Sequence, residues 1–192
     1  MDDLEEKITL TDDMFAGCMR KGLLRAGFQP GRRFGLWDLL YGAMLPSGAE
    51  CCIALADTIS GSEADFAELM NKKAKKLGMV DTHFCDSTGL HDPDHYSTVK
   101  DIAVLMKYCI KNDTFREIIE TARHSTGITN VHPDGITYYS TMFKKSVRFP
   151  RLQVEKYLAV RLGIPVRQDI VWQALRRLRA GNIFCHCRST WK

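Results

Sequence analysis

The stretch that decides the fold is LLYGAMLPSGAECCIALADTISGS, residues 39–62, in which a Pro-Ser-Gly break separates two apolar runs. Before the break, apolar residues recur at helical spacing, at Leu36, Leu39, Leu40, Ala43 and Met44. Pro46 stops this run because proline lacks the N–H that would continue a helix. After the break, a second helix is predicted by Ile53, Leu55, Ala56 and Ile59. The sequence therefore predicts two helices joined by a short turn with Ser47 in its middle.

Two capping pairs predict further helices downstream. Ser62 with Asp65 three residues later indicates a helix start, and Gly78 ends the apolar face behind this cap. Thr98 and Asp101 form a second pair, and the apolar face behind them consists of Ile102, Leu105, Met106, Cys109 and Ile110. Residues 116–121 extend the helical part.

The β content is predicted to be small. Residues 81–96 are rich in turn-forming residues, and residues 124–141, which contain β-branched residues around the sequence HPDG, predict a two-stranded hairpin. The alternating residues Lys7–Thr11 predict one short strand. We therefore expect a mainly α fold with a minor β part.

Length and composition fit one globular domain. The chain has 192 residues, of which 45% are hydrophobic and 26% charged, as in folded rather than disordered proteins. No apolar run approaches the roughly 18 residues of a membrane-spanning helix. The acidic start MDDLEE has neither the basic nor the apolar region of a signal peptide, so the sequence as written predicts no export.

The seven cysteines form no evident disulfide framework, because their number is odd. Cys51 and Cys52 are adjacent on an apolar run, and cysteine on such a run is commonly a buried thiol. We expect free thiols rather than disulfides.

The charge is divided unevenly along the chain. Residues 144–192 contain 12 Lys and Arg against only Glu155 and Asp169, a net charge of +10, whereas the remaining 143 residues carry 15 basic and 21 acidic residues, a net of −6. A basic tail can bind nucleic acid or anionic lipid. Since no aromatic interleaving or groove-reading motif accompanies it, we expect no nucleic-acid partner.

Four ordered segments carry a resemblance to a known family: DLLYG…LPSG, MNKKAKKLGM, THF….GLH and HYST..D, all within residues 38–101. Over about residues 4–145 the chain resembles the D-alanyl-D-alanine carboxypeptidases, low-molecular-mass penicillin-binding proteins of the S11 serine peptidase type. The resemblance implies a fragment of the α/β β-lactamase/transpeptidase-like fold, chiefly its helical subdomain.

The chemistry of this family requires three motifs that converge in space. Ser-x-x-Lys supplies the nucleophile and an amine that removes its proton, Ser-x-Asn relays protons and orients substrate, and Lys-Thr-Gly binds the terminal carboxylate. By resemblance, Ser47 is the catalytic serine of the second motif, and Gly48 and Ala49 contact the substrate. Ala49 stands where the family usually has Asn, so the amide that would hold substrate is absent. From local sequence alone, Ser47 after Pro46 is equally well interpreted as a helix N-cap.

The first and third motifs are expected to be missing. STVK at 97–100 has the spacing of the first motif, but Ser97 or Thr98 is better interpreted as the cap of the next helix. We expect the true first motif to be encoded upstream of Met1, which leaves no nucleophile in this chain. HSTG at 124–127 is similar to Lys-Thr-Gly but lacks the cation and comes too early, so we interpret it as hairpin strand.

No metal site and no organic cofactor are predicted. His91 and His95 are four residues apart, but Pro93 prevents them from sharing one helix face as a zinc pair. CHC at 185–187 offers three crowded ligands without a second half of a site.

The basic tail is consistent with a frameshift between about residues 144 and 157. Leu158–Gly163 can be encoded by TTG GCG GTA AGA CTG GGN, which read from its third base gives Gly-Gly-Lys-Thr-Gly. The same frame over Arg167–Ala174 permits Ala-Gly-Tyr-Cys-Leu-Ala-Ser, which resembles the segment directly after the third motif in these enzymes. We therefore expect residues 1–145 to be a partial catalytic domain and residues 146–192 to be out-of-frame translation. The alternative is a genuine basic amphipathic helix at Val171–Ala180 that resembles the family's membrane anchor.

The resemblance implies a serine-type D-Ala-D-Ala carboxypeptidase that acts on peptidoglycan stem peptides through an acyl-enzyme, with β-lactams acylating the same serine in intact members. We predict that this truncated chain is inactive, and the alternative is a non-catalytic remnant that binds cell-wall peptide or serves as a scaffold. The family works in the cell envelope outside the cytoplasmic membrane, whereas this chain as written would stay in the cytoplasm. Membrane association is expected only through a family-type anchor, which is not evident here.

Overall fold

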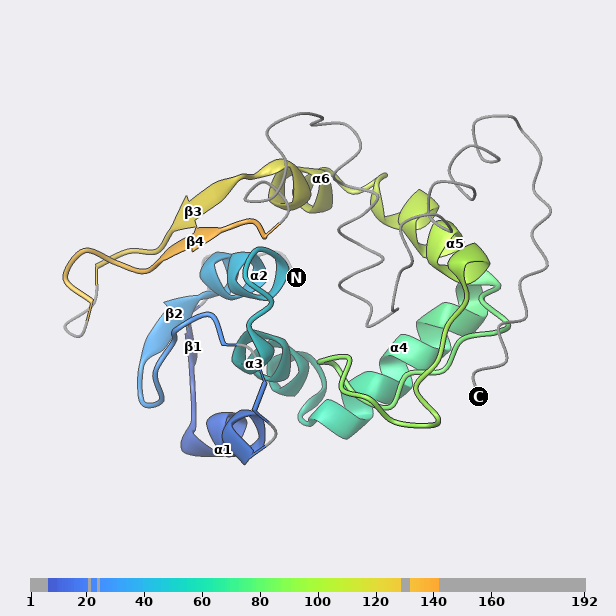
Figure 1. Cartoon of the computed structure of the whole chain (residues 1–192), viewed down its shortest axis with the longest axis horizontal. Coiled ribbons are helices and arrows are strands. Elements are labelled where there is room, and N and C mark those ends of the chain that lie inside the picture. Colours follow the sequence, from blue (N-terminus) through green and yellow to red (C-terminus); the bar gives the residue numbers. More distant parts are fainter. Residues whose placement is uncertain (1–6, 21, 24, 129–131, 142–192) are drawn as a thin grey trace.

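Figure 1 shows a computed structural model of the chain, which describes residues 7–20, 22–23, 25–128 and 132–141. Within these residues there are six helices and four short strands, so the prediction of a mainly α fold with a minor β part is confirmed. The predicted out-of-frame segment at 146–192, and the alternative helix within it, lie outside the described residues.

The N-terminal strand has a partner that the sequence did not reveal. β1 (Lys7–Thr9) pairs antiparallel with β2 (Arg33–Gly35), and Ile8 lies opposite Phe34. Both of these side chains are buried in the core. The chain between the strands forms α1 (Asp12–Arg20), which was not predicted, and α1 packs against the third helix.

The two helices predicted around the Pro-Ser-Gly break are confirmed. α2 (Leu36–Met44) ends just before the break, and α3 (Ala49–Ser60) begins directly after it. The two helices approach closely at Gly42, where an added Cβ would lie 2.6 Å from the sulfur of Cys51 and 2.8 Å from the ring of Phe28. Glycine is therefore required at this helix contact, because any side chain would collide with α3.

Both predicted helix N-caps, Ser62 and Thr98, are confirmed. α4 (Glu63–Leu77) begins after Ser62, and α5 (Val99–Cys109) begins after Thr98. In each case the cap oxygen accepts a hydrogen bond from the N–H three residues later, at 3.0 and 3.2 Å. Each such cap stabilises a helix by about 1 kcal/mol. Gly78 ends α4 in the left-handed conformation, as expected of a helix C-terminus.

The turn-rich segment at 81–96 connects α4 to α5. Asp86 organises this connection, because one of its oxygens accepts hydrogen bonds from the N–H groups of Thr88, Gly89 and Leu90 at 2.6, 2.6 and 3.3 Å and from the Thr88 hydroxyl at 2.8 Å. Burial acts to raise the pKa of Asp86, but these hydrogen bonds outweigh it and hold the pKa below its usual value.

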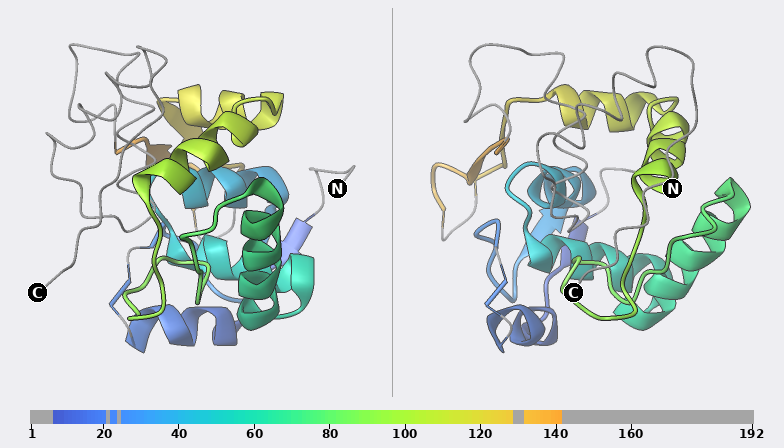
Figure 2. Two further views of the ribbon diagram at one scale, coloured as in Figure 1. Left: turned by 90° about the vertical axis from the view of Figure 1, so that its right-hand side faces the viewer. Right: turned by 45° about the vertical axis from the view of Figure 1, so that its right-hand side comes forward.

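The predicted hairpin follows α6 (Asp113–Glu120). β3 (Arg123–Ser125) pairs antiparallel with β4 (Thr137–Tyr139). Figure 1 and the right-hand view of Figure 2 show α4 and α5 on the side of the molecule away from this hairpin. The helices α2 and α3, with the turn that joins them, lie between the hairpin and the α4–α5 side.

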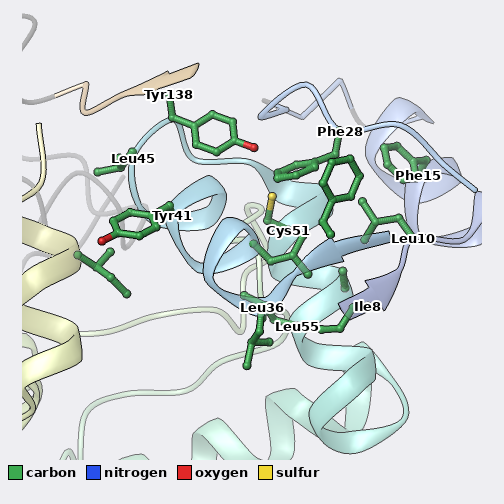
Figure 3. Packing of buried hydrophobic residues seen from close by; sticks show 14 residues of the cluster. Ile8, Leu10, Phe15, Phe28, Leu36, Tyr41, Leu45, Cys51, Leu55 and Tyr138 are labelled. Carbon is green, nitrogen blue, oxygen red and sulfur yellow. The ribbon is translucent and has the colours of Figure 1, made fainter. Parts of the chain in front are cut away.

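In the part of the chain that the structure describes, the core has one large cluster and one small one. The large cluster, seen in Figure 3, is centred on α2 and α3 and includes the fully buried Leu10, Leu36, Leu39 and Leu45. Burying one such side chain contributes about 1.5–3 kcal/mol. The small cluster consists of Ala74 of α4 with Met79 and Phe84 of the following segment, and Val104 and Leu105 in the middle of α5 pack against it.

The cysteines are free thiols wherever the structure describes them, which confirms the prediction for Cys18, Cys51, Cys52, Cys85 and Cys109. Burial raises the pKa of the Cys51 thiol well above its ordinary value, so this group stays protonated and apolar within the core. Among the described helices, none has the length and apolar character needed to cross a membrane.

Candidate active site

Ser47 lies half-buried in the turn between α2 and α3 and has a backbone φ of 70°. It is the one residue other than glycine with a positive φ in the part of the chain that the structure describes. For a residue with a β-carbon, this left-handed conformation costs about 1–2 kcal/mol. Strained residues of this kind cluster at functional sites, so the backbone marks Ser47 as a candidate independently of the sequence motif.

The interpretation of Ser47 as a helix N-cap is wrong. The N-cap of α3 is Gly48, which makes no side-chain cap hydrogen bond. Ser47 precedes the cap, and its hydroxyl has no hydrogen-bond partner among the described residues. The hydroxyl is therefore not used to hold the helix.

Gly48 is wedged between α2 and the segment 25–28. Its N–H donates to the carbonyl oxygen of Gly42 at 2.9 Å. An added Cβ would lie 2.6 Å from the Cβ of Ala26 and 3.0 Å from both the Ala26 nitrogen and the Gly42 oxygen. A side chain cannot be placed here without moving backbone, so the turn requires glycine next to Ser47.

Ala49 and Glu50 begin α3. Ala49 is 5% exposed, and its methyl group can neither donate nor accept a hydrogen bond. Glu50 is fully buried, and its Oε1 accepts the N–H groups of Ala26 and Gly27 at 2.7 and 3.1 Å. Burial raises the pKa of Glu50, although hydrogen bonds from the backbone oppose the rise. Sequence analysis missed Glu50, whose signal is a single acidic residue within an otherwise apolar run.

The hairpin contacts α2 and the start of the turn that contains Ser47. His124 on β3 lies with its Nε2 2.9 Å from Oδ1 of Asp38, and its ring stacks on that of Tyr41 with centroids 3.9 Å apart. Beyond β4, the N–H of Thr141 donates to the carbonyl oxygen of Leu45 at 3.3 Å. The interpretation of HSTG at 124–127 as hairpin strand is confirmed for its first two residues, which belong to β3.

The structure places STVK at 97–100 in a structural role. Thr98 is the N-cap of α5, as one of the two residues expected there. The Ser97 hydroxyl lies 2.8 Å from that of Thr82, and Lys100 is exposed to solvent. A second Ser-x-x-Lys, at 189–192, lies outside the described residues.

The described residues include no group of three or more His, Cys, Asp and Glu that is placed to bind a metal ion. Of the two histidines considered for zinc, His91 is exposed, and Nδ1 of His95 lies 3.5 Å from Oδ2 of Asp86. CHC at 185–187 lies outside the described residues.

The fold is that of the penicillin-binding DD-peptidases. The Streptomyces K15 DD-transpeptidase matches with a TM-score of 0.65 and 28% sequence identity, over 72% of this chain and 56% of that one. Penicillin-binding protein 6B of Escherichia coli matches with a TM-score of 0.63 and 30% identity, over 72% of this chain and 42% of that one. This chain thus contains part of the fold of these proteins.

The family model for D-alanyl-D-alanine carboxypeptidase, peptidase S11, matches residues 3–145, and the chain belongs to this family. D-alanyl-D-alanine carboxypeptidase DacF of Bacillus subtilis (strain 168) is 38% identical over 93 residues, 48% of this chain and 24% of its own length. DacD of Escherichia coli (strain K12) is 36% identical over 114 residues, 58% of this chain and 29% of its own length. The resemblance seen in the sequence is confirmed, and the matches span less than a third of these relatives.

Proposed function

We propose that this chain forms the second-motif side of a D-Ala-D-Ala carboxypeptidase site, with Ser47 as the serine that relays protons and orients substrate. Gly48 and Ala49 then lie along the bound peptide, a peptidoglycan stem peptide that ends in D-Ala-D-Ala. The observation that carries the proposal is the left-handed backbone of Ser47, whose hydroxyl is not used as a helix cap. Membership of the S11 family supports the same role.

In the complete reaction, a serine nucleophile attacks the carbonyl carbon of the penultimate D-Ala, releases the terminal D-Ala and is freed when water hydrolyses the ester. We propose that the 192-residue chain on its own does not form this acyl-enzyme. STVK at 97–100 supports this view, because the Ser97 hydroxyl is paired with Thr82 and Lys100 points into solvent at the start of α5. A non-catalytic peptide-binding role is the second candidate, favoured by Ala49, whose methyl cannot replace an amide in the reaction.

Covalent labelling with a fluorescent penicillin tests the absence of an acyl-enzyme. The purified chain is incubated with the probe and separated under denaturing conditions, next to an S11 carboxypeptidase that contains all three motifs. We expect label on that enzyme and none on this chain. A labelled serine, located by mass spectrometry of peptides and abolished by its replacement with alanine, would overturn the proposal.

Titration with a stem peptide ending in D-Ala-D-Ala, followed by NMR of the labelled protein, tests peptide binding. The matched control peptide ends in L-Ala-L-Ala. We expect the D-peptide alone to shift the resonances of Ser47 and its neighbours. The variant Ser47→Ala should bind about two- to tenfold more weakly, which corresponds to one lost hydrogen bond. Identical shifts with both peptides, or no shifts, would contradict recognition of D-Ala-D-Ala.

A further inference from the structure

Glu50 connects the Ser47 turn to a distant part of the chain, and the proposed chemistry does not use this connection. Its carboxylate is fully buried three residues after Ser47, and Oε1 accepts the N–H groups of Ala26 and Gly27. One acceptor atom therefore fixes two successive peptide units of the segment 25–28. Oε2 has no partner within the described part of the chain.

The segment that Glu50 holds lies directly against the turn. The backbone nitrogen of Ala26, which donates to Glu50, lies only 3.0 Å from the point where Gly48 would carry a Cβ. The Cβ of Ala26 lies 2.6 Å from the same point. Because these atoms fill the space beside Gly48, a shift of Ala26 changes the room available to the turn, and Ser47 is the next residue.

On its other side, the segment is anchored in the core. The ring of Phe28 packs edge-on against Phe34 with centroids 4.2 Å apart, and against Tyr138 at 5.6 Å. Figure 3 shows Phe28 between Tyr138 and Leu10, with Cys51 of α3 beneath it. The segment thus connects the hairpin and the core to the turn, and Glu50 supplies its polar link to α3.

Stability alone does not account for a carboxylate at this position. Burying an acceptor oxygen without a partner lowers stability, and a buried carboxylate is costlier than a neutral group. What the side chain provides is an oxygen that accepts both N–H groups at once, which the amide oxygen of glutamine would do equally. Burial also raises the pKa of Glu50, in agreement with this environment.

We infer that Glu50 is a positioning residue for Ser47: by holding Ala26 and Gly27 against Gly48, its Oε1 keeps Ser47 in the left-handed conformation. The inference rests on the proposed function, because it assigns to that conformation the orientation of the Ser47 hydroxyl toward substrate. Glu50 itself is buried and does not touch the peptide.

The test compares Glu50→Leu, which removes the acceptor, with Glu50→Gln, whose amide oxygen still accepts both N–H groups. The readout is the strong intraresidue Overhauser effect between the amide and α protons of Ser47, which is a signature of positive φ. The matched control is Asp101→Leu, because Asp101 is also fully buried, with one oxygen that accepts from Asp81 and Thr82 and one without a partner in the described residues.

We expect Glu50→Leu to lose the Ser47 signature while Glu50→Gln and Asp101→Leu keep it. If Glu50→Leu does not fold, Glu50→Asp takes its place, because its shorter side chain withdraws the oxygen from both N–H groups. Retention of the signature in the variant without the acceptor, or its loss in Glu50→Gln, would overturn the inference.

Peptide affinity separates this inference from the proposed function. The Overhauser signature needs no ligand, so it reports on positioning even if the stem peptide does not bind. If the peptide binds, we expect Glu50→Leu to weaken its affinity about tenfold and Glu50→Gln to restore it. Loss of the signature without any change in affinity would show that Glu50 holds Ser47 but that the Ser47 conformation does not serve binding, and this would overturn the functional part of the inference.

Discussion

Replacing Gly48 by alanine tests the contact on which the geometry of the Ser47 turn depends. The added Cβ would lie 2.6 Å from the Cβ of Ala26 and 3.0 Å from the Ala26 nitrogen and the Gly42 oxygen. Two of these three atoms belong to the backbone, so no side-chain rotation relieves the collision. Overpacking of this kind costs about 1–3 kcal/mol. With a loss of about 2 kcal/mol, the melting temperature of a chain of this size should fall by about 4–8 °C.

Urea unfolding followed by far-ultraviolet circular dichroism measures this loss, and the dependence of the free energy on urea concentration should stay unchanged. Gly127→Ala is the matched control, because no heavy atom of the described residues lies within 4 Å of its added Cβ and its φ is not in the left-handed region. We expect the control to change the free energy of unfolding by no more than about 0.5 kcal/mol.

Equal unfolding midpoints for Gly48→Ala and Gly127→Ala would refute the reasoning, since the close approach at Gly48 would then not contribute to the free energy of unfolding. A loss of stability in Gly48→Ala with the Ser47 Overhauser signature unchanged would show that the collision is relieved away from the turn. In that case, the link from Ala26 through Gly48 to Ser47 would be wrong even though the packing is tight.

Three further predictions concern titration and the gene. Because burial raises the pKa of Glu50, its native carboxyl binds more protons than the unfolded one, so stability falls as pH rises from about 4.3 through the folded-state pKa. Glu50→Gln removes this dependence of the free energy of unfolding on pH. In urea unfolding, the variant should therefore gain stability relative to the unmodified chain as the pH is raised from acidic to neutral. The pKa of Asp86 is lowered, so its contribution is present above about pH 4 and is lost as pH falls through the folded-state pKa. Asp86→Asn should therefore make the free energy of unfolding depend less steeply on pH below about pH 4. An unchanged pH dependence would contradict the role of the Asp86 hydrogen bonds. Sequencing the gene from well upstream of the Met1 codon should show Ser-x-x-Lys coding before it and Lys-Thr-Gly coding in a neighbouring frame after residue 144, whereas in-frame coding of residues 146–192 in the native gene would rule out the frameshift.

Several elements follow from local sequence because local interactions define them. The periodicity of α2, the Ser62 and Thr98 caps and the Gly78 helix end all depend on residues within one or two turns of the same helix. The four segments that resemble the S11 family are likewise contiguous, so family membership could be inferred without a structure. The identity of Ser47 as a candidate came from the same stretch.

The pairing of β1 with β2 and the conformation of Ser47 could be learned only from the tertiary structure, because they depend on groups that are far apart in the sequence. β2 was not predicted because three residues, Arg33–Gly35, have no distinctive pattern until Ile8 lies opposite Phe34 across the pair. The choice between helix cap and strained turn at Ser47 also lay beyond the local sequence, which allows both. Ala26 and Gly42 settle this choice, because their atoms fill the space beside position 48 so that only glycine fits next to Ser47. The buried Glu50 holds Ala26 in place by accepting its N–H. Long-range packing, rather than the residues next to Ser47 in the chain, therefore sets the conformation of its backbone.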